Sequence, residues 1–362
     1  MLAACGSDAG SGGTSSSPAG QSSAGSSNST TVNTTSATCV SGTLKSDGST
    51  AQQNAMNQWI SNYQQQCSGA SITYGGGGSG QGITDFSNKQ VDFAGSDAAL
   101  DPSKGEVAKA SQACGSQAID LPMVTGPIAI AYHVKGVKTL TLTAEQIAKI
   151  FTGKITKWND PSLVASNKGV TLPAETITVF NRSDASGTTQ NFERYLAASA
   201  PSVWTAKPAK QWAGAGQGKK GNQLVGQAVQ STEGGIGYVE WSYAIQNNLD
   251  EAQIDNGGGP VALTADTVAK TIATATVAPS GPGDLTLKLD YATKTPGAYP
   301  IVLVTYEIVC TKYSNPQTGS LVKSFLTFAA SNQQQTAVHN LGYAALPASV
   351  QAKVQAQLAK IS

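Results

Sequence analysis

Short apolar runs alternate with amphipathic stretches along residues 40–362. Ala51, Ala55, Trp59 and Tyr63 recur at four-residue intervals, which is the spacing of one face of a helix. We expect further helices at 83–88, 143–152, 188–198, 321–331 and 348–361, and strands at 43–45, 72–74, 91–94, 119–133, 176–181, 234–239 and 299–310. This alternation predicts an α/β protein with helices on both faces of its sheet.

Local patterns refine three of these segments. Thr50 and Gln53 have the spacing of a capping box, which predicts the start of the first helix. The run 119–133 is interrupted by Thr125-Gly126-Pro127 and is long enough to pass between two domains. Clusters of Gly and Pro make the elements of 255–300 hard to assign.

Composition narrows the class of protein. The chain has 362 residues and a mass of 36.9 kDa, enough for about two domains. Lys and Arg total 23 against 22 acidic residues, and a net charge of +1 argues against a nucleic-acid groove. Charged residues make up only 12 %, so Ser, Thr, Gln, Asn and Gly must cover much of the surface, which suits a protein outside the cytosol. No run of 18 apolar residues occurs that would span a membrane.

The first forty residues predict a lipid anchor and a tether. Leu2-Ala3-Ala4-Cys5 resembles the lipobox at which bacterial lipoproteins are cleaved and acylated on the cysteine. Residues 6–38 are almost all Gly, Ser, Thr, Ala and Asn, so they cannot bury enough apolar surface to fold. As a flexible coil they would span on the order of 32 Å. The charged and apolar parts of a signal peptide are missing before Leu2, which indicates a trimmed chain or a misplaced start. An ordinary linker with a stray cysteine is the alternative.

Four cysteines remain when Cys5 is set aside, an even number that suits an oxidising compartment. They are Cys39, Cys67, Cys114 and Cys310, and their spacing fits no zinc or Cys-X-X-Cys motif. Three pairings are possible. We expect Cys67 to pair with Cys114 and Cys39 with Cys310, because each cysteine lies at the end of an expected element.

Three expected strands are each followed by a turn of small and hydroxyl residues and then by a helix start. These turns are 47–51, 75–82 and 182–189. A helix start offers unpaired N–H groups and a partial positive charge, and a hydroxyl adds a further donor. One such turn alone is ordinary helix capping. Three that meet would form a site for a small oxyanion.

Arg182 and Arg194 are the two arginines of the chain. Arg182 lies four residues before Ser186 in the third turn, where a planar guanidinium can clamp an oxyanion and Asp184 can orient it. A surface ion pair with Asp184 is the alternative. For Arg194 we expect a solvated helix face.

Asp97 follows the apolar run 91–96, at the C-terminal end of a strand, where α/β sheets place ligand clefts. A carboxylate repels a fully deprotonated anion but accepts a hydrogen bond from a protonated one. Phosphate keeps a proton at neutral pH and sulfate does not, so Asp97 predicts selectivity for phosphate. A turn or cap residue is the alternative.

The turns at 75–82 and 182–188, the run 91–98 and the segments 142–160 and 235–240 resemble the substrate-binding protein of the bacterial ABC phosphate importer. The further motifs are Ile150-Phe151-Thr152-Gly153-Lys154-Ile155, Lys157-Trp158-Asn159-Asp160 and Gly235-Ile236-Gly237-Tyr238-Val239-Glu240, and the resemblance covers about residues 40–362. It implies a two-domain periplasmic-binding-protein fold of type II, with the ligand cleft between domains joined by two crossovers. The domains would comprise 40–132 with 300–362, and 133–299.

The resemblance also implies a site and partners. Phosphate would be held by the side chains of Thr50, Ser79, Asp97, Arg182, Ser186 and Thr188, and by the backbone N–H groups of Ala51 and Gly187. Many relatives carry Phe where Ala51 stands, a change that should spare a main-chain contact. The expected partners are the phosphate ion, the permease of an importer and, through Cys5, the outer face of a bacterial cell membrane. We expect a monomer, with no cofactor, metal or nucleic acid.

Other interpretations remain. A binding protein for sulfate or another oxyanion is one, and Asp97 is the feature against it. A secreted phosphatase with Ser186 as nucleophile would need a base or a metal, yet His133 and His339 lie far apart in the sequence. The Gly-rich segment 214–221, with Lys219 and Lys220, resembles a phosphate cradle, but it lacks the full P-loop pattern and follows no clear strand, so we expect a surface loop.

Overall fold

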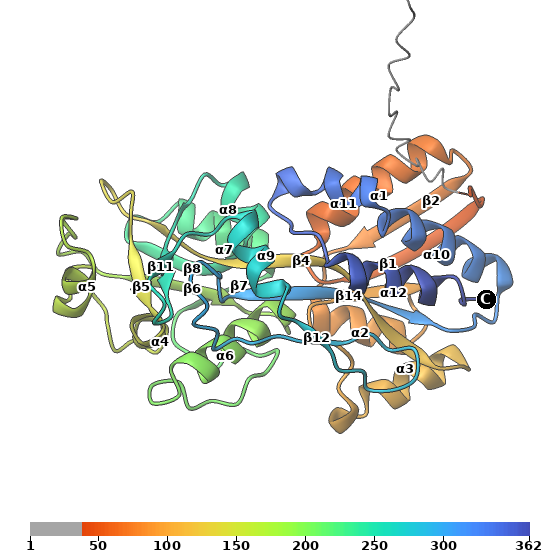
Figure 1. Ribbon diagram of the computed structural model, residues 1–362, viewed down its shortest axis with the longest axis horizontal. Helices are drawn as coiled ribbons and strands as arrows, with labels where there is room; N and C mark the ends of the chain where they lie inside the picture. Colours follow the sequence, from red (N-terminus) through yellow and green to blue (C-terminus); the bar gives the residue numbers. More distant parts are fainter. Residues whose placement is uncertain (1–37) are drawn as a thin grey trace, which may run out of the picture. The chain divides into compact units, whose positions relative to one another are not determined.

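The computed structural model describes residues 38–362, so the predicted lipobox, Cys5 and the tether lie outside the described residues. Its main sheet has the strand order β2-β1-β3-β14-β4-β8-β6-β7, and β9 also pairs with β4. β4 (Ala118–His133) belongs to two segments of this sheet, because residues 118–127 pair with β14 and residues 128–133 pair with β8. We call the strands on the β14 side the first segment and those on the β8 side the second segment (Figure 1).

The first segment combines strands from both ends of the described chain. They are β1 (Gly42–Gly48), β2 (Ala70–Gly75), β3 (Phe93–Ser96) and β14 (Val302–Cys310). β1 runs parallel to β2 and β3, whereas β14 runs antiparallel to β3 and β4. Every residue of β14 is buried, as expected for a central strand covered on both faces.

The second segment is built from one continuous stretch of chain. Its strands are the end of β4, β8 (Gly235–Glu240), β6 (Thr178–Arg182) and β7 (Gln217–Lys219). β8 runs antiparallel to β4, and β6 runs parallel to both β8 and β7. The carboxyl end of β6 therefore delivers Arg182 to the edge of the sheet where the next helix begins.

Helices cover both faces of each segment, as predicted (Figure 1). On the first segment, α1 (Gln53–Gln66), α10 (Pro316–Ala329) and α12 (Ala348–Leu358) lie opposite α2 (Ser79–Ser87) and α3 (Glu106–Cys114). On the second, α7 (Gly221–Gln230) and α8 (Trp241–Gln246) lie opposite α4 (Ala144–Phe151) and α6 (Gly187–Ser199). The helix expected at 143–152 is α4, and a capping box formed by Thr143 and Gln146 opens it.

Smaller elements complete the described chain. They are η1 (Pro102–Lys104), β5 (Thr141–Thr143), α5 (Pro161–Ser166), β9 (Asp250–Glu251), β10 (Gln253–Asp255), β11 (Pro260–Val261), α9 (Ala265–Ile272), β12 (Thr276–Val277), β13 (Leu287–Lys288), α11 (Asn332–Ala337) and η2 (His339–Leu341). β11, β10 and β5 form a separate small sheet, and β12 pairs with β13. No helix within residues 38–362 is long and apolar enough to cross a membrane.

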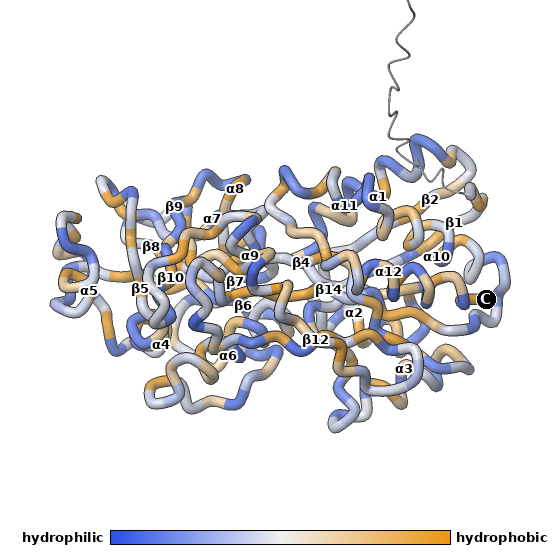
Figure 2. The backbone as a smooth tube through the Cα atoms, viewed as in Figure 1, coloured by the Kyte–Doolittle hydropathy of each residue, from blue (hydrophilic) through white to orange (hydrophobic). Residues whose placement is uncertain are grey.

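Apolar side chains fill the space between sheet and helices in both segments. Figure 2 shows the hydrophobic stretches along the inner strands and the hydrophilic ones along helices and loops. In the first segment the ring of Tyr63 lies 5.5 Å from that of Phe325, edge to face. In the second, Phe192 lies 4.6 Å from Tyr238 and 5.9 Å from Trp212. Each segment therefore has its own aromatic core.

Two of the connections between the segments lie side by side. The predicted interruption of β4 at Thr125-Gly126-Pro127 is wrong, because Gly126 and Pro127 pair with Leu303 and Val302 and the strand continues. The return crossing lies beside it, since Ile128 N donates to Ile301 O at 2.8 Å and Tyr299 Oη donates to Ile128 O at 2.7 Å. Only extended chain therefore connects the segments at these crossings.

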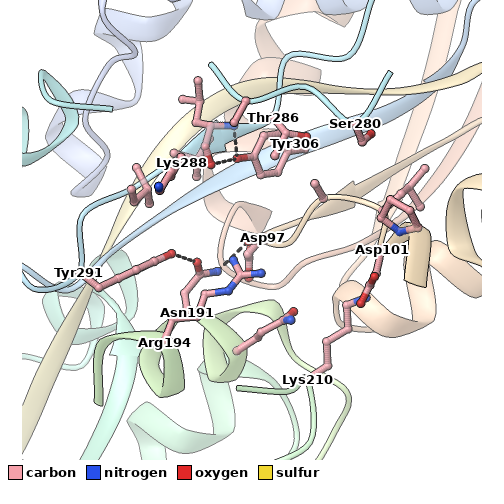
Figure 3. Close-up of a pocket in the computed structure, with 18 residues that line it drawn as sticks. Asp97, Asp101, Asn191, Arg194, Lys210, Ser280, Thr286, Lys288, Tyr291 and Tyr306 are labelled. Carbon is pink, nitrogen blue, oxygen red and sulfur yellow. Dashed lines mark hydrogen bonds between the residues drawn. The ribbon is translucent and has the colours of Figure 1, made fainter. Parts of the chain in front are cut away.

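A third connection comes from residues 273–298, which we call the strap and which follow α9. Leu285 N in the strap donates to Asp120 O of β4 at 3.0 Å, in the first segment. Farther along, Tyr291 O accepts a hydrogen bond from Ser199 Oγ of α6 at 2.8 Å, in the second. Figure 3 shows Thr286, Lys288 and Tyr291 of the strap above α6. The strap thus spans both segments.

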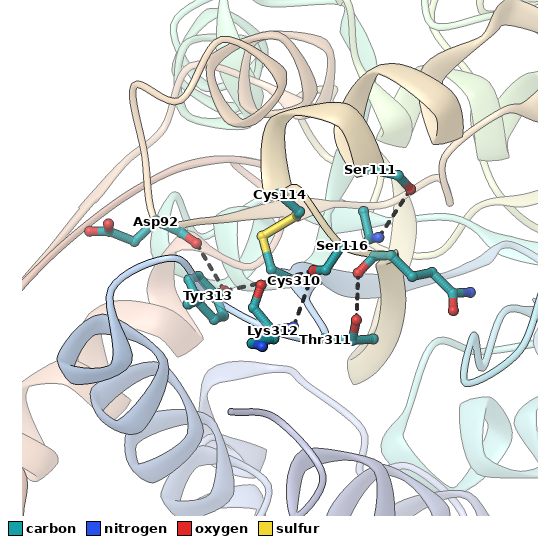
Figure 4. The surroundings of a disulfide bond; sticks show 10 residues. Asp92, Ser111, Cys114, Ser116, Cys310, Thr311, Lys312 and Tyr313 are labelled. Carbon is teal, nitrogen blue, oxygen red and sulfur yellow. Dashed lines mark hydrogen bonds between the residues drawn. A yellow bond between two sulfur atoms is a disulfide. The ribbon is translucent and has the colours of Figure 1, made fainter.

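The two disulfides differ from the predicted pairing. Cys39 pairs with Cys67, and Cys114 pairs with Cys310 (Figure 4). Strand register explains both. β1 and β2 begin their pairing at Gly42 and Ala70, so the cysteines three residues before each partner lie side by side. Likewise, Cys310 of β14 lies opposite Ala118 of β4 in the sheet. Cys114, at the end of α3, precedes Ala118 by four residues and so lies near Cys310.

Candidate oxyanion site

The three predicted turns meet where the two sheet segments face each other. The turn after β2 contacts the turn after β1, because Gly78 N donates to Gly48 O at 2.8 Å. It also contacts the turn after β6, because Gly80 N donates to Ala185 O at 2.9 Å. The sequence therefore predicted correctly that these turns share one place in the fold.

Two helices begin at this meeting point, α2 at Ser79 and α6 at Gly187. Ser79 Oγ accepts a hydrogen bond from Asp97 N at 3.2 Å, and Ser186 Oγ accepts one from Thr189 N at 3.1 Å. A Cβ atom on Gly187 would lie 2.7 Å from both Asp97 Cβ and Ser79 Oγ, so only glycine fits there. The starts of α2 and α6 consequently lie on either side of Asp97.

The Asp97 carboxylate forms the acidic part of the site. It is only 2 % exposed. Its Oδ1 accepts hydrogen bonds from Ser49 Oγ and from Thr305 Oγ1 at 3.0 Å, and its Oδ2 accepts one from Thr188 Oγ1 at 3.1 Å. Burial raises the pKa of Asp97, while these hydroxyl donors and the charge of Arg182 oppose the rise. Oδ2 keeps a lone pair with which it can accept one further hydrogen bond.

Arg182 provides the positive charge and is 2 % exposed. Its Nε donates to Asp184 Oδ1 at 2.8 Å and its Nη2 donates to Asp184 Oδ2, which is a bidentate pair. Nη1 lies 3.4 Å from Thr188 Oγ1. Burial raises the pKa of Asp184, but the bonds and charge of Arg182 outweigh it, so that this pKa is lowered overall. The alternative of a surface ion pair is wrong, because the side chain of Arg182 is 1 % exposed and that of Asp184 is 12 % exposed.

Thr50 has a different role from the predicted helix cap. The N-cap of α1 is Gln52, and no side chain caps it. Instead Thr50 Oγ1 accepts hydrogen bonds from Asn222 N at 3.2 Å and Asn222 Nδ2 at 3.0 Å, across to the second segment. Ala51 N donates to Ser49 Oγ at 3.0 Å. The first turn therefore faces the start of α7 as well as Asp97.

The Gly-rich segment 214–221 is also placed differently from the prediction of a surface loop. It contains β7, which pairs with β6, and it leads directly into α7. Gly221 N donates to Asp184 Oδ1 at 3.0 Å. This segment thus holds the carboxylate that binds Arg182, a role that the sequence does not reveal because β7 is short and polar.

Three further side chains at the site were not predicted: Ser49, Asn222 and Thr305. Ser49 lies within a turn that the sequence did single out, so the signal was present. Asn222 and Thr305 lie in stretches without a motif, and only the fold brings them to Thr50 and Asp97. Asn222 Nδ2 also lies 3.3 Å from Thr188 Oγ1, so Asn222 contacts both Thr50 and Thr188.

The arrangement suits a small anion that carries both acceptors and one proton. Asp184 balances the charge of Arg182 and occupies its Nε, which leaves N–H bonds on Nη1 and Nη2 for a ligand. The hydroxyls of Thr50, Ser79, Ser186 and Thr188 are all at most 5 % exposed. Among residues 38–362, no cluster of three or more His, Cys, Asp and Glu could hold a metal ion.

Arg194 is not on a solvated helix face, contrary to expectation. It lines a cavity of about 470 Å³ next to Asp97, together with Asn191, Lys210 and Tyr291 (Figure 3). The periodicity of α6 marked its position as outside the core, but the strap passes over this face of the helix. A strap with no clear pattern could not be placed there from the sequence.

Comparison with known proteins identifies the family. The sequence model described as a PBP superfamily domain matches residues 33–333. A phosphate-binding protein PstS2 of Mycobacterium bovis is 46% identical over 324 residues, which is 88% of this chain and 87% of that protein. The chain belongs to this family of phosphate-binding proteins within the PBP superfamily. Phosphate-binding protein PstS3 of the same organism is 46% identical over 310 residues, 84% of this chain and 83% of that protein.

Solved structures agree with this placement in the PBP superfamily. A high-affinity periplasmic phosphate-binding protein, PfluDING, bound with phosphate, has a TM-score of 0.69 and 22% identity, covering 87% of this chain and 93% of that chain. At this identity the likeness concerns the fold. The fold is the predicted type II periplasmic-binding-protein fold, in which two α/β parts are joined by crossing strands.

Proposed function

We propose that this protein binds inorganic phosphate outside the cytoplasm and delivers it to the permease of an ABC importer. The observation that carries the proposal is the buried pairing of Arg182 with Asp184 beside an Asp97 carboxylate that keeps a free acceptor position. The names of the M. bovis relatives at 46% identity support it.

Each group at the site has a role in this proposal. The free N–H bonds of Arg182 donate hydrogen bonds to the anion, and the hydroxyls of the turns with the backbone N–H groups of Ala51 and Gly187 bind its oxygens. The protonated oxygen donates to Asp97 Oδ2. The side-chain contacts come from Thr50, Ser79, Asp97, Arg182, Ser186 and Thr188. Asp184 orients the guanidinium without touching the ion.

The two sheet segments act as two domains in this proposal, residues 40–132 with 300–362 and residues 133–299. They close on the ion by bending at the two adjacent crossings. Direct hydrogen bonds between the segments support a closed arrangement: Asn54 Nδ2 donates to Ser242 Oγ at 2.8 Å, and Tyr243 Oη donates to Thr50 O at 2.8 Å. A monomer that docks through both domains is the simplest form for delivery.

Anchoring through lipid on Cys5 is part of the proposal. The sequence Leu2-Ala3-Ala4-Cys5 supports it, and the Ser/Thr/Gly-rich tether would hold the folded body close to the outer face of the membrane. Mass spectrometry of the protein expressed with a complete signal peptide tests this point. A mass increase from acyl groups that disappears in Cys5→Ala is expected, and an unmodified Cys5 would contradict the anchor.

The test of binding is a calorimetric titration of phosphate-free protein at neutral pH and physiological salt. We expect tight one-to-one binding of phosphate and no heat from sulfate. Arg182→Ala should weaken phosphate binding by about 2–5 kcal/mol, because a buried charge then loses its partner. Equal binding of phosphate and sulfate would favour a general oxyanion binder, and no binding of either would refute the proposal.

No observation favours the phosphatase alternative. Ser186 Oγ caps α6 by accepting from Thr189 N, and within residues 38–362 no histidine or carboxylate hydrogen-bonds to it. A serine nucleophile requires such a base. Hydrolysis of a generic phosphomonoester, abolished in Ser186→Ala, would be the result that revives an enzyme.

A further inference from the structure

The proposed function makes no use of the cavity of about 470 Å³ beside Asp97. It is lined by Gln190, Asn191 and Arg194 of α6, by the strap between Ala278 and Tyr291, by the segment 97–102 after β3, and by Lys210 with Val304 and Tyr306 of β14. Its size lies within the range of small-ligand sites. Figure 3 shows Arg194 extending from α6 into this space, with Tyr291 and Tyr306 across from it.

Arg194 has a free positive charge in this cavity. The guanidinium of Arg182 is paired with Asp184, and Lys210 Nζ is paired with Glu106 Oε1 at 2.8 Å. Arg194 forms no ion pair with any of residues 38–362. Burial raises the pKa of Tyr291 and Tyr306, and the charge of Arg194 opposes both rises, so this charge lies near both phenols.

A second polar group in the cavity lacks a partner. Gln190 is 8 % exposed and lines the cavity, and its Oε1 accepts no hydrogen bond from the described residues. The neighbouring Asn191 is fully used, because its Nδ2 donates to Asp97 O at 2.7 Å and its Oδ1 accepts from Tyr291 Oη. A free acceptor and a guanidinium without an ion pair in the same cavity are the combination that a protonated oxyanion can satisfy.

The cavity is the open space next to the buried site. Asp97 is common to both, since its carboxylate lies in the site and the residue also lines the cavity. Arg182, Ser186 and Thr188 are at most 2 % exposed and do not line the cavity. A ligand that leaves the closed site on the strap side must therefore pass Asp97 and enter the space that contains Arg194.

We propose that this cavity is an outer anion site, in which Arg194 binds phosphate on its way to and from Arg182. The inference rests on the proposed function. Lys288 adds a second positive charge at the strap, while Asp97 and Asp101 carry the opposing charges around the cavity. The outer site is accordingly weak, and it is empty once the ion has moved to the inner site. Arg194 lowers the barrier in both directions and has little effect on equilibrium affinity.

The experiment measures rates with the full chain and inorganic phosphate. Phosphate-free protein is mixed rapidly with radiolabelled phosphate and quenched with excess unlabelled phosphate, which gives association and release rates. Arg194→Gln should reduce both rates by about threefold to tenfold, with a dissociation constant within about threefold of wild type. Arg194→Lys keeps the charge and should restore most of both rates. Lys353→Gln, an exposed site on α12, removes the same charge elsewhere and should change neither.

Several results would overturn the outer site. Unchanged rates in Arg194→Gln would do so, and so would an equal loss in Lys353→Gln, which would reflect net charge alone. A faster release with an unchanged association rate would show that Arg194 acts on the bound ion rather than on its passage. If the wild-type protein bound no phosphate, the proposed function itself would fail, which is a separate outcome. Thermal unfolding of each variant checks that Arg194→Gln is folded.

Discussion

Replacement of Asp97 by Asn tests how the site distinguishes phosphate from sulfate. The substitution keeps the size of the side chain, and Asn Oδ1 can still accept from Ser49 and Thr305, which hold Asp97 Oδ1. It removes the negative charge and places an N–H₂ donor where Oδ2 accepts from Thr188. The change is therefore confined to the atoms that would face the ion.

The magnitude follows from charge and burial. Two unit charges 4 Å apart interact by about 4 kcal/mol at an effective dielectric constant near 20. Asp97 is 2 % exposed, so solvent screens this interaction little. Removing one such repulsion should strengthen sulfate binding by about 10³-fold. Phosphate loses a hydrogen bond to a charged acceptor, which costs about 1.5–3 kcal/mol of binding free energy. Part of this loss is offset because the charge repulsion between phosphate and Asp97 also disappears. The preference for phosphate should fall by about three orders of magnitude.

Calorimetric titration with phosphate and with sulfate, each alone and then in competition, measures this preference. Asp92→Asn is the matched control, because Asp92 lies five residues away and accepts from Lys45 N outside the site. It should leave both affinities unchanged. If the phosphate-over-sulfate preference of Asp97→Asn stays within threefold of the wild-type value, the Asp97 carboxylate does not select phosphate through its proton.

Three further changes test the charge, the buried acid and the disulfides. Arg182→Lys keeps the charge but cannot bind Asp184 in two places, so phosphate affinity should fall by about 10²-fold or more; retention of the phosphate-induced rise in melting temperature would contradict this. Burial raises the pKa of Glu307 to about 8, with Asp97 adding to the rise and Gln52 opposing it. The folded state thus binds this proton more tightly than the unfolded state, and stability should fall by up to about 1.4 kcal/mol per pH unit between roughly pH 5 and 8. Glu307→Gln lacks this loss and should be the more stable protein at pH 9 in urea unfolding; a stability difference that does not vary with pH would count against it. Removing the Cys114–Cys310 disulfide, which spans 196 residues, should lower the free energy of unfolding by about 5 kcal/mol. Removing Cys39–Cys67, which spans 28 residues, should lower it by about 4 kcal/mol. The reverse order in chemical denaturation would show that loop length does not decide the effect.

The sequence was informative where local pattern decides structure. The apolar run at 119–133 became β4, and the helix expected at 143–152 is α4. Ser186 lies at a helix start because a short hydroxyl side chain is a good partner for the free N–H groups there. Arg182 was found because arginine is rare in this chain.

The sequence was less informative where contacts between segments far apart in the chain decide the structure. Thr50 has the spacing of a helix cap, yet its hydroxyl accepts from Asn222, more than 170 positions away along the chain. The cysteine pairing depends on the register of β1 with β2 and of β14 with β4, which no spacing within the sequence reveals. Gln217–Lys219 is too short and polar to be recognised as a strand, so the segment that holds Asp184 was misplaced.

The position of β14 between β3 and β4 has a consequence for the order of folding. The second segment consists of consecutive residues and can form as soon as that stretch of chain is available. The first segment has a gap at its centre until residues 302–310 arrive, near the end of synthesis and translocation. Until then β3 and β4 expose unpaired edges, which are aggregation-prone. We therefore expect the N-terminal half to require protection during export, and truncation before Val302 to leave a foldable second segment beside an unfolded first one.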